Sequence, residues 1–219
     1  MTRPIEQAAT GTIFGVALNY HSQLDHKLAE FREAPYKAPP TKPVLFIKTP
    51  NTRNRHEGSV VFPASCERLQ PGPSIGVVIG KKASRVKKDG VLSYVAGLTI
   101  VNEFSLPEDS FYRPAVKAKC RDGFCPMGPE LVELADIADP DQLVLKLYVN
   151  GELRQEGSTA DWVRSIQELL VDITEFMTLN EGDVLITGTP GGRVDVKPGD
   201  QVTVEVSGLG SLTNTIVAE

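Results

Sequence analysis

A strictly alternating segment in residues 141–149 (DQLVLKLYV) restricts the folds open to this chain. Three leucines, at 143, 145 and 147, fall on one face of an extended strand, and the residues between them fall on the other. The dipeptide Asn150-Gly151 follows directly and is a strong hairpin signal, because both residues tolerate the positive φ angles of a tight turn. The segment therefore predicts antiparallel β-structure.

Short apolar segments between Gly and Pro turns continue along the rest of the chain. A length of 219 residues, with 19 glycines and 16 prolines, suits a turn-rich single domain over residues 1–219. We expect helices over 87–97 and 162–178, and a short helix or ordered loop in 19–31. The fold class expected is a β-rich α+β domain with mixed sheets and few flanking helices. The strands expected are 11–18, 44–48, 59–62, 74–79, 98–103, 141–149, 184–188, 201–206 and 211–217.

The charge pattern and the termini narrow the functional classes. A formal net charge of -5 argues against nucleic acid as a partner, and the basic cluster at 81–88 is short and interrupted. No apolar segment is long enough to span a membrane, and the first residues lack the apolar region of a secretory signal. The three cysteines follow no zinc or CxxC spacing. We therefore expect a cytoplasmic protein without a membrane partner.

Two polar segments are candidates for binding an anion. Lys117, Lys119 and Arg121 surround Asp122 within a long irregular segment, and such cations suit a carboxylate ligand; a solvated charge cluster is the alternative. Residues 186–192 (ITGTPGG) place small residues after a strand, where hydroxyls and backbone amides are free to face a carboxylate. An ordinary turn at the end of a strand is equally consistent with this second segment.

Two further features concern catalysis. His21 and His26 follow the first strand and are candidates for a general base, although exposed loop histidines are the simpler interpretation. Residues 72–76 (GPSIG) match the G-x-S-x-G pattern of a nucleophilic serine. That pattern requires a strand before the serine and a helix after it, whereas here prolines precede Ser74 and a strand follows. We therefore do not expect a serine nucleophile.

Nine short segments occur in a characteristic order along the chain: Asn19-Tyr20, 46–50 (FIKTP), 76–80, 94–97 (YVAG), 119–124 (KCRDGF), Asn150-Gly151, 155–159 (QEGST), 178–183 (TLNEGD) and 187–191 (TGTPG). Taken together, they resemble the fumarylacetoacetate hydrolase family over about residues 11–217. Two further segments, 35–39 (PYKAP) and 105–126, resemble the branch that isomerises and decarboxylates intermediates of 4-hydroxyphenylacetate (homoprotocatechuate) degradation.

The resemblance implies a mixed β-roll and a small 2-oxo or enol dicarboxylate as substrate. It also implies that 5-carboxymethyl-2-oxohexenedioate is decarboxylated and that 2-hydroxyhepta-2,4-diene-1,7-dioate is isomerised to its 2-oxo form. In both steps a divalent metal, Mg²⁺ or else Mn²⁺ or Ca²⁺, would chelate the 2-oxo acid and stabilise the enolate. Together with the residue patterns above, we expect Lys119, Asp122, His26 and His21 to be catalytic, and Tyr20, Lys48, Arg121, Thr187, Gly188 and Thr189 to bind substrate.

The chain departs from the family pattern at the metal ligands. The expected Glu-x-Glu falls on Gly72 and Ser74, which leaves Glu103 as the one acid of the three ligands. The family's His and Glu pair falls on Gln23 and His26. We therefore expect no intact metal site.

Three functions remain open from the sequence. In the first, the chain is an isomerase or decarboxylase subunit that holds its substrate with Lys48, Lys119 and Arg121, and His21 or His26 moves the proton. In the second, it is a structural partner of a homologous subunit that retains the metal ligands. The third, hydrolysis of a carbon–carbon bond, ranks last because it requires an activated water. A homo-oligomer or such a hetero-oligomer is expected.

Overall fold

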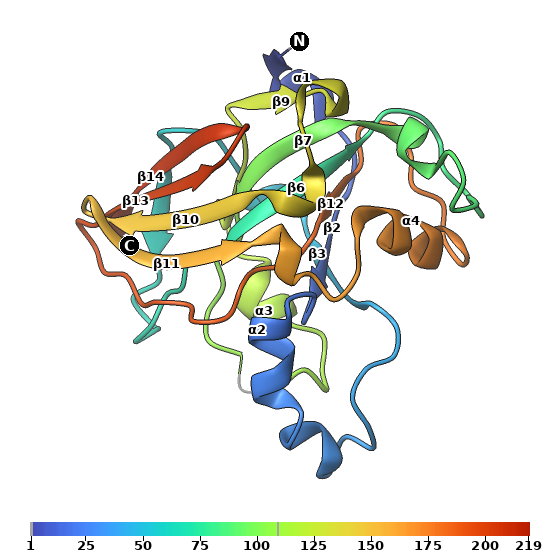
Figure 1. Ribbon diagram of the computed structural model, residues 1–219. Coiled ribbons are helices and arrows are strands. Elements are labelled where there is room, and N and C mark those ends of the chain that lie inside the picture. Colours follow the sequence, from blue (N-terminus) through green and yellow to red (C-terminus); the bar gives the residue numbers. More distant parts are fainter. Residues whose placement is uncertain (1, 109) are drawn as a thin grey trace.

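The structure is a computed structural model that describes residues 2–108 and 110–219. Two large β-sheets form its body (Figure 1). The seven-stranded sheet has the order β1-β9-β7-β6-β12-β2-β3, the five-stranded sheet has the order β11-β10-β13-β14-β5, and β4 pairs with β8. The strands are β1 Thr2–Pro4, β2 Ile13–Ala17, β3 Val44–Lys48, β4 Arg53–Asn54, β5 Ser59–Phe62, β6 Pro73–Ile79, β7 Val95–Asn102, β8 Cys125–Pro126, β9 Glu130–Val132, β10 Val144–Val149, β11 Glu152–Ser158, β12 Val184–Ile186, β13 Gln201–Val206 and β14 Gly210–Ala218.

Helices are short and few among the described residues. They are α1 Ile5–Ala8, α2 His21–Leu24, α3 Val116–Lys119 and α4 Ile166–Thr174, with single 3₁₀ turns between other elements. Both large sheets are mixed, because β12 runs parallel to β2 and β14 runs parallel to β5 while their other pairings are antiparallel. This confirms the predicted β-rich α+β class.

All seven residues of strand β6 are buried. Ile75 and Val77 face the larger core, which lies where β13 and β14 pack against β7 and β10 packs against β6. Val78 faces the smaller core, together with Ile5 of α1. Each such aliphatic side chain contributes about 1.5–3 kcal/mol when it is fully buried, so β6 anchors both layers.

The predicted hairpin is confirmed. Asn150 and Gly151 both have positive φ, 53° and 82°, and they join β10 to the antiparallel strand β11. The leucines at 145 and 147 are completely buried, as their alternation predicted.

Both predicted helices differ from the structure. A helix over 87–97 is wrong: residues 91–94 form a 3₁₀ turn, and β7 begins at Val95 because this β-branched segment pairs with β6. The helix predicted over 162–178 is shorter, Ile166–Thr174. It begins where the Ser165 side chain accepts from the Glu168 amide and the Glu168 carboxylate accepts from the Ser165 amide, a capping box.

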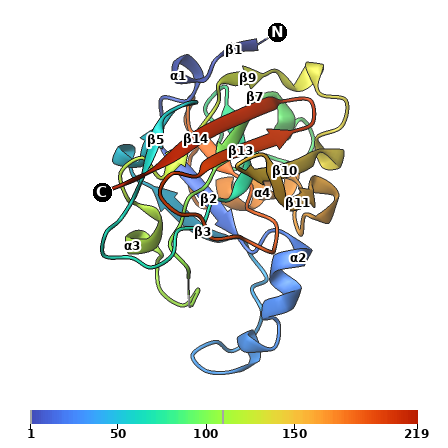
Figure 2. The ribbon, with the colours of Figure 1, turned by 90° about the vertical axis from the view of Figure 1, so that its left-hand side faces the viewer.

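The segment between β2 and β3, residues 18–43, projects away from the body, and we call it the arm. In Figures 1 and 2, α2 and the turns that follow it lie below the sheets. Phe31 of the arm packs against Tyr36 and Phe111, with ring centroids 4.8 and 6.3 Å away. The backbone amide of Phe111 also donates to the Tyr36 hydroxyl at 2.7 Å. These contacts join the arm to the irregular segment that follows β7.

Candidate functional site

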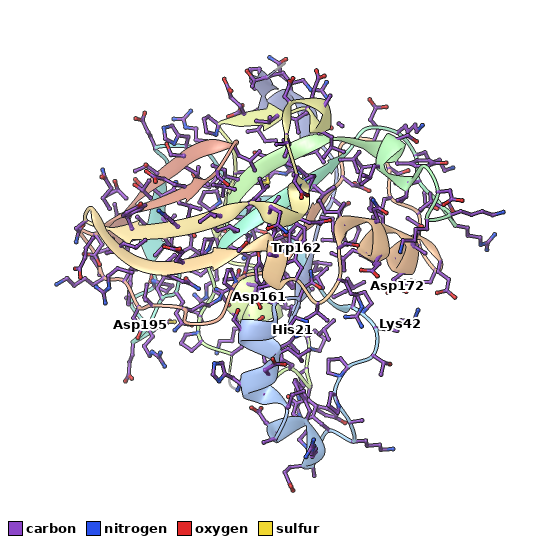
Figure 3. All side chains as sticks on the ribbon, viewed as in Figure 1. His21, Lys42, Asp161, Trp162, Asp172 and Asp195 are labelled. Carbon is purple, nitrogen blue, oxygen red and sulfur yellow. The ribbon has the colours of Figure 1, made fainter. Side chains whose placement is uncertain are left out.

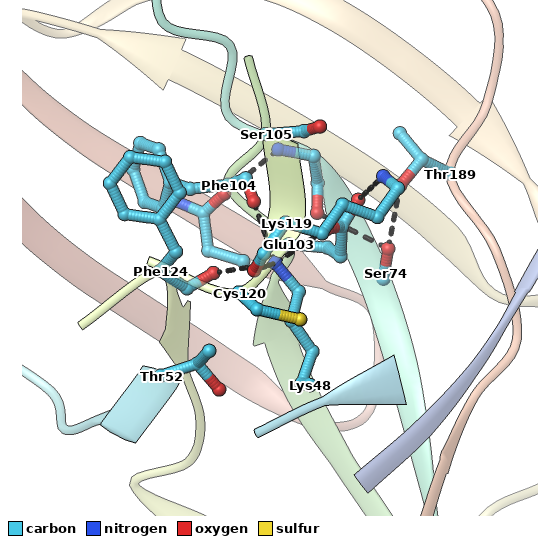
Figure 4. Close-up of polar contacts among 12 residues, drawn as sticks. Lys48, Thr52, Ser74, Glu103, Phe104, Ser105, Lys119, Cys120, Phe124 and Thr189 are labelled. Atoms are coloured by element: carbon cyan, nitrogen blue, oxygen red, sulfur yellow. Dashed lines mark hydrogen bonds and ion pairs between the residues drawn. The ribbon is translucent and has the colours of Figure 1, made fainter. Parts of the chain in front are cut away.

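Three segments that are distant in sequence bring cations to one buried carboxylate. Glu103 lies directly after β7 and is 1% exposed. The Lys48 ammonium, at the end of β3, is 2.7 Å from Glu103 Oε1, and the Lys119 ammonium, at the end of α3, is 2.9 Å from Oε2. Arg193 Nη2 also contacts Oε2. Figure 4 shows Lys48 reaching from β3 toward Glu103 and Lys119. We call Lys48, Glu103, Lys119 and Arg193 the charge cluster.

The charge of Glu103 is set by these neighbours. Burial alone would raise the pKa of the Glu103 carboxyl, but Lys119, Lys48 and Arg193 together hold that pKa well below its ordinary value of 4.5. Glu103 is therefore ionised at neutral pH. Its single negative charge is shared among three cations.

The Lys48 side chain is fully buried, and its ammonium binds backbone carbonyls as well as Glu103. Its ammonium donates to the carbonyls of Phe104, Lys119 and Phe124 at 2.7, 2.8 and 3.1 Å. Burial lowers the pKa of Lys48, and the adjacent Glu103 opposes that shift. With its hydrogens occupied in this way, Lys48 has none to offer a ligand.

Lys119 connects the charge cluster to a cavity. Its ammonium also pairs with Glu108 Oε2 at 2.9 Å and lies 4.6 Å from the centroid of the Phe46 ring. Glu108 is one of the residues that line a cavity of about 170 Å³, which matches a small acid in size. The cavity is lined by Gln23, Lys27, Gln70, Ser105, Leu106, Glu108, Phe111, Pro190, Gly191, Gly192 and Arg193.

Arg193 lies next to positions 72 and 74, where the family pattern has acidic residues. A Cβ on Gly72 would lie 2.9 Å from Arg193 Nη2 and 2.8 Å from Thr189 Oγ1. Ser74 Oγ is 2.8 Å from Thr189 Oγ1, and Arg193 Nη2 donates to that same Thr189 oxygen at 3.2 Å. The guanidinium therefore lies among positions 72, 74 and 103.

The residues present do not fit the divalent metal that the resemblance implies. Glycine at position 72 has no side-chain atom to bind a metal, and the hydroxyl of Ser74 is engaged with Thr189. Glu103 is surrounded by three cations, which would repel a metal ion. In the described part of the chain, no group of three His, Cys, Asp or Glu residues is arranged to hold a metal.

The structure brings some of the predicted site residues together. Lys48, Lys119 and Thr189 all meet at Glu103 or at Arg193 beside it. Thr187 is buried too, but its hydroxyl donates to the Ile75 carbonyl at 3.1 Å and so holds two strands together.

Other predicted residues lie away from the charge cluster. Gly188 forms a turn with φ of 106°, against the Val16 carbonyl. Tyr20 is completely buried and packs edge-on against Trp162; burial, chiefly, raises its pKa. Arg121 donates to the Lys117 carbonyl at 3.2 Å, and the exposed Asp122 accepts from Asn51 at 2.6 Å.

Both candidate histidines are exposed on the arm. His21 lies 3.8 Å from Asp25, and Figure 3 shows it near Asp161 and Trp162, where the arm leaves the body. Neither His21 nor His26 lines the cavity described above. The cavity is instead lined by Gln23, which occupies one position of the family's acid–base pair.

Sequence reasoning missed two residues of this site, Arg193 and Glu108. Arg193 follows the matched segment 187–191 by two residues, and the loss of acids at 72 and 74 was a signal to look for a compensating cation there. Glu108 lies in an irregular segment, where no periodicity indicates the direction of a side chain.

Comparison with known proteins agrees with this arrangement. Residues 12–217 match the family model described as fumarylacetoacetate (FAA) hydrolase C-terminal. The chain belongs to the fumarylacetoacetate hydrolase family. It is 46% identical over 209 residues to a 4-hydroxyphenylacetate degradation bifunctional isomerase/decarboxylase of Salmonella dublin, which covers 95% of this chain and 48% of the relative. It therefore spans about half the length of that relative.

Solved structures of family members have the same fold. A 5-carboxymethyl-2-hydroxymuconate delta-isomerase from Mycobacterium smegmatis superposes with a TM-score of 0.83 at 28% identity, covering 97% of this chain and 80% of that one. A 2-hydroxyhepta-2,4-diene-1,7-dioate isomerase from Mycobacterium marinum gives a TM-score of 0.82 at 27% identity, covering 97% and 76%. These matches confirm the predicted family fold. In the part of the chain that the structure describes, no helix is long and apolar enough to cross a membrane.

Proposed function

We propose that this chain is a cytoplasmic isomerase/decarboxylase subunit for small 2-oxo or enol dicarboxylates, and that 2-hydroxyhepta-2,4-diene-1,7-dioate is its substrate for isomerisation. One observation carries the proposal: three cations meet two carboxylates, Glu103 and Glu108, beside a cavity the size of a small acid. This excess of positive charge favours an anionic ligand. Relatives named as isomerase/decarboxylases support the same chemistry.

The isomerisation needs only proton movement. The 2-hydroxyl of the dienol loses a proton, the double bonds shift, and carbon 5 gains a proton, so no electrons are exchanged with another molecule. Positive charge near the 2-oxygen stabilises the enolate that forms between these two events. In this proposal Arg193 and Lys119 supply that charge, and Glu108, the carboxylate in the cavity wall, carries the proton.

Binding of the distal carboxylate is assigned to Lys27. Lys27 is one of the residues that line the cavity; its ammonium pairs with Glu30 at 2.7 Å, and its side chain is 35% exposed. It therefore reaches a ligand without the cost of leaving a buried partner unpaired. His21 and His26 have no role in this proposal, because neither lines the cavity.

The test is an assay of the purified chain with the dienol in the presence of a chelator, following the loss of dienol absorbance. We expect isomerisation by the wild type. Glu108→Gln should lower kcat about 100-fold, the usual effect of removing a general base, with little change in KM. Lys27→Gln should raise KM about tenfold with kcat retained, because it removes one charge-assisted contact.

Lys42→Gln is the matched control, since the exposed Lys42 pairs with Asp172 and neither residue is among those that line the cavity. This variant should behave like the wild type. A wild-type chain that isomerises nothing would contradict the proposed function, and an unchanged kcat in Glu108→Gln would remove Glu108 from the mechanism.

A second candidate is a structural partner of a homologous, metal-binding subunit. It is favoured by the internal use of Lys48, whose hydrogens go to three backbone carbonyls, and by the half-length match to the relatives. Co-expression with a homologue that retains the Glu-x-Glu ligands, followed by light scattering and the same assay, distinguishes the two. A stable mixed oligomer whose activity depends entirely on the homologue supports this second candidate.

A further inference from the structure

We propose that the guanidinium of Arg193 is the resident cation of this site and takes the place of the divalent metal ion. It neutralises Glu103 and leaves positive charge for a small 2-oxo dicarboxylate, so that the ligand binds without metal. The assignment of a ligand rests on the proposed function, whereas the exclusion of metal does not.

The first argument is the space beside Gly72. A Cβ at this position would come within 2.9 Å of Arg193 Nη2 and within 2.7 Å of the Glu103 carbonyl. An acidic side chain at 72 and the guanidinium of Arg193 therefore compete for the same volume. Because Gly72 has no side chain, the Arg193 guanidinium can occupy this volume.

The second argument is the set of contacts that fixes the guanidinium. Nη2 contacts the Glu103 carboxylate and Thr189 Oγ1, and Nη1 donates to the Glu103 carbonyl at 3.1 Å. The Arg193 guanidinium thus binds both the side-chain carboxylate and the backbone carbonyl of Glu103. A planar guanidinium satisfies several acceptors at fixed angles, which a lysine ammonium does not.

The third argument is the permanence of the charge. Arginine remains protonated under all conditions in which proteins are folded. Its side chain is 15% exposed and lines the cavity, so its charge acts on a ligand there. A metal ion approaching Glu103 would meet Arg193, Lys119 and Lys48, and both carboxylate oxygens of Glu103 are already in contact with these cations.

The first arm of the test concerns metal alone. Mn²⁺ is titrated into chelator-treated wild-type protein and followed by electron paramagnetic resonance. We expect no stoichiometric site with a dissociation constant below about 1 mM, a weak limit corresponding to about 4 kcal/mol. A one-to-one site of micromolar affinity would overturn the proposal, whatever the enzyme assay gives.

The second arm concerns the ligand. 2-Oxoadipate, a stable 2-oxo dicarboxylate, is titrated calorimetrically in chelator and again with Mg²⁺. We expect binding in chelator that Mg²⁺ leaves unchanged. Arg193→Gln should weaken it roughly tenfold to a hundredfold, as the loss of charge-assisted hydrogen bonds predicts. Arg193→Lys, which keeps the charge but not the fork, should recover part of that affinity.

Arg154→Gln on the outer strand β11 is the matched control, because Arg154 is 45% exposed and away from the cavity. Circular dichroism melting establishes that each variant folds. If Arg193→Gln fails to fold, the comparison of wild-type binding with and without Mg²⁺ and the affinity of Arg193→Lys still test whether Arg193 replaces the metal.

Two outcomes of the second arm overturn the proposal: binding that appears only with Mg²⁺, and wild-type affinity in Arg193→Gln. Absence of 2-oxoadipate binding under both conditions also overturns its ligand half. Metal-free binding of 2-oxoadipate without isomerisation of the dienol would support the role of Arg193 while contradicting the proposed function, so the two failures are distinguishable.

Discussion

At the scale of single residues, Glu103 carries the largest electrostatic consequence. It is buried and its partners are three cations, so removing its charge would leave those cations unbalanced. We expect Glu103→Gln to lower the free energy of unfolding by about 3–5 kcal/mol near neutral pH, the usual cost of breaking a buried ion pair. Urea denaturation measures this change, and Glu152→Gln, at an exposed side chain, is the control.

The same variant predicts a pH dependence with a definite sign. The folded-state pKa of Glu103 is held below 4.5, so its contribution to stability is present above that pH and is lost as the pH falls below it. The stability gap between wild type and Glu103→Gln should therefore shrink on acidification from about pH 7 to about pH 3.5. A gap that stays constant would show that the ionised carboxylate is not what stabilises the fold.

Individual residues of the charge cluster were predictable in part. Lys48 and Glu103 were identified from the resemblance, and Lys119 from both the cation cluster at 117–121 and the resemblance. Arg121 is only two residues from Lys119, yet α3 ends at Lys119 and the Arg121 side chain turns back to the Lys117 carbonyl. Proximity in sequence did not indicate direction, because the chain leaves its helix between the two residues.

At the scale of elements, the entry to β6 controls the space available to Arg193. We expect Gly72→Ala to lower the free energy of unfolding by about 1–3 kcal/mol, the usual cost of overpacking, since its Cβ would crowd the Glu103 carbonyl and Arg193. Urea denaturation checks the stability, and a crystal structure of the variant should show the guanidinium displaced. A variant as stable as the wild type, with Arg193 in place, would contradict the proposed competition for space.

Strands were easier to predict than helices in this chain. The bounds of β3, β5 and β13 agree with the sequence prediction, because alternation and turn residues define them locally. Residues 87–97 also show apolar residues at helical spacing, but pairing of Val95 and its neighbours with β6 overrides that pattern. Partners distant in sequence decide such segments.

At the scale of the whole molecule, net charge and local charge have opposite signs. The chain carries a formal charge of -5, whereas the charge cluster concentrates Lys48, Lys119 and Arg193 around one carboxylate. The net charge argues against a nucleic-acid partner but contains no information about this cluster. The three cations come from positions spread over more than 140 residues of the chain, and only the fold brings them together.

The aromatic contacts between the arm and the segment after β7 bear on how a ligand enters and leaves the cavity. Gln23 and Lys27 of the arm form one wall, and Glu108 and Phe111 form another. Phe31 of the arm packs against Tyr36 and Phe111, and the Phe111 amide donates to the Tyr36 hydroxyl, so these contacts connect the two walls directly. We therefore expect ligand entry and release to depend on these aromatic contacts: weakening them should change both rates, while the charges that hold the ligand stay the same.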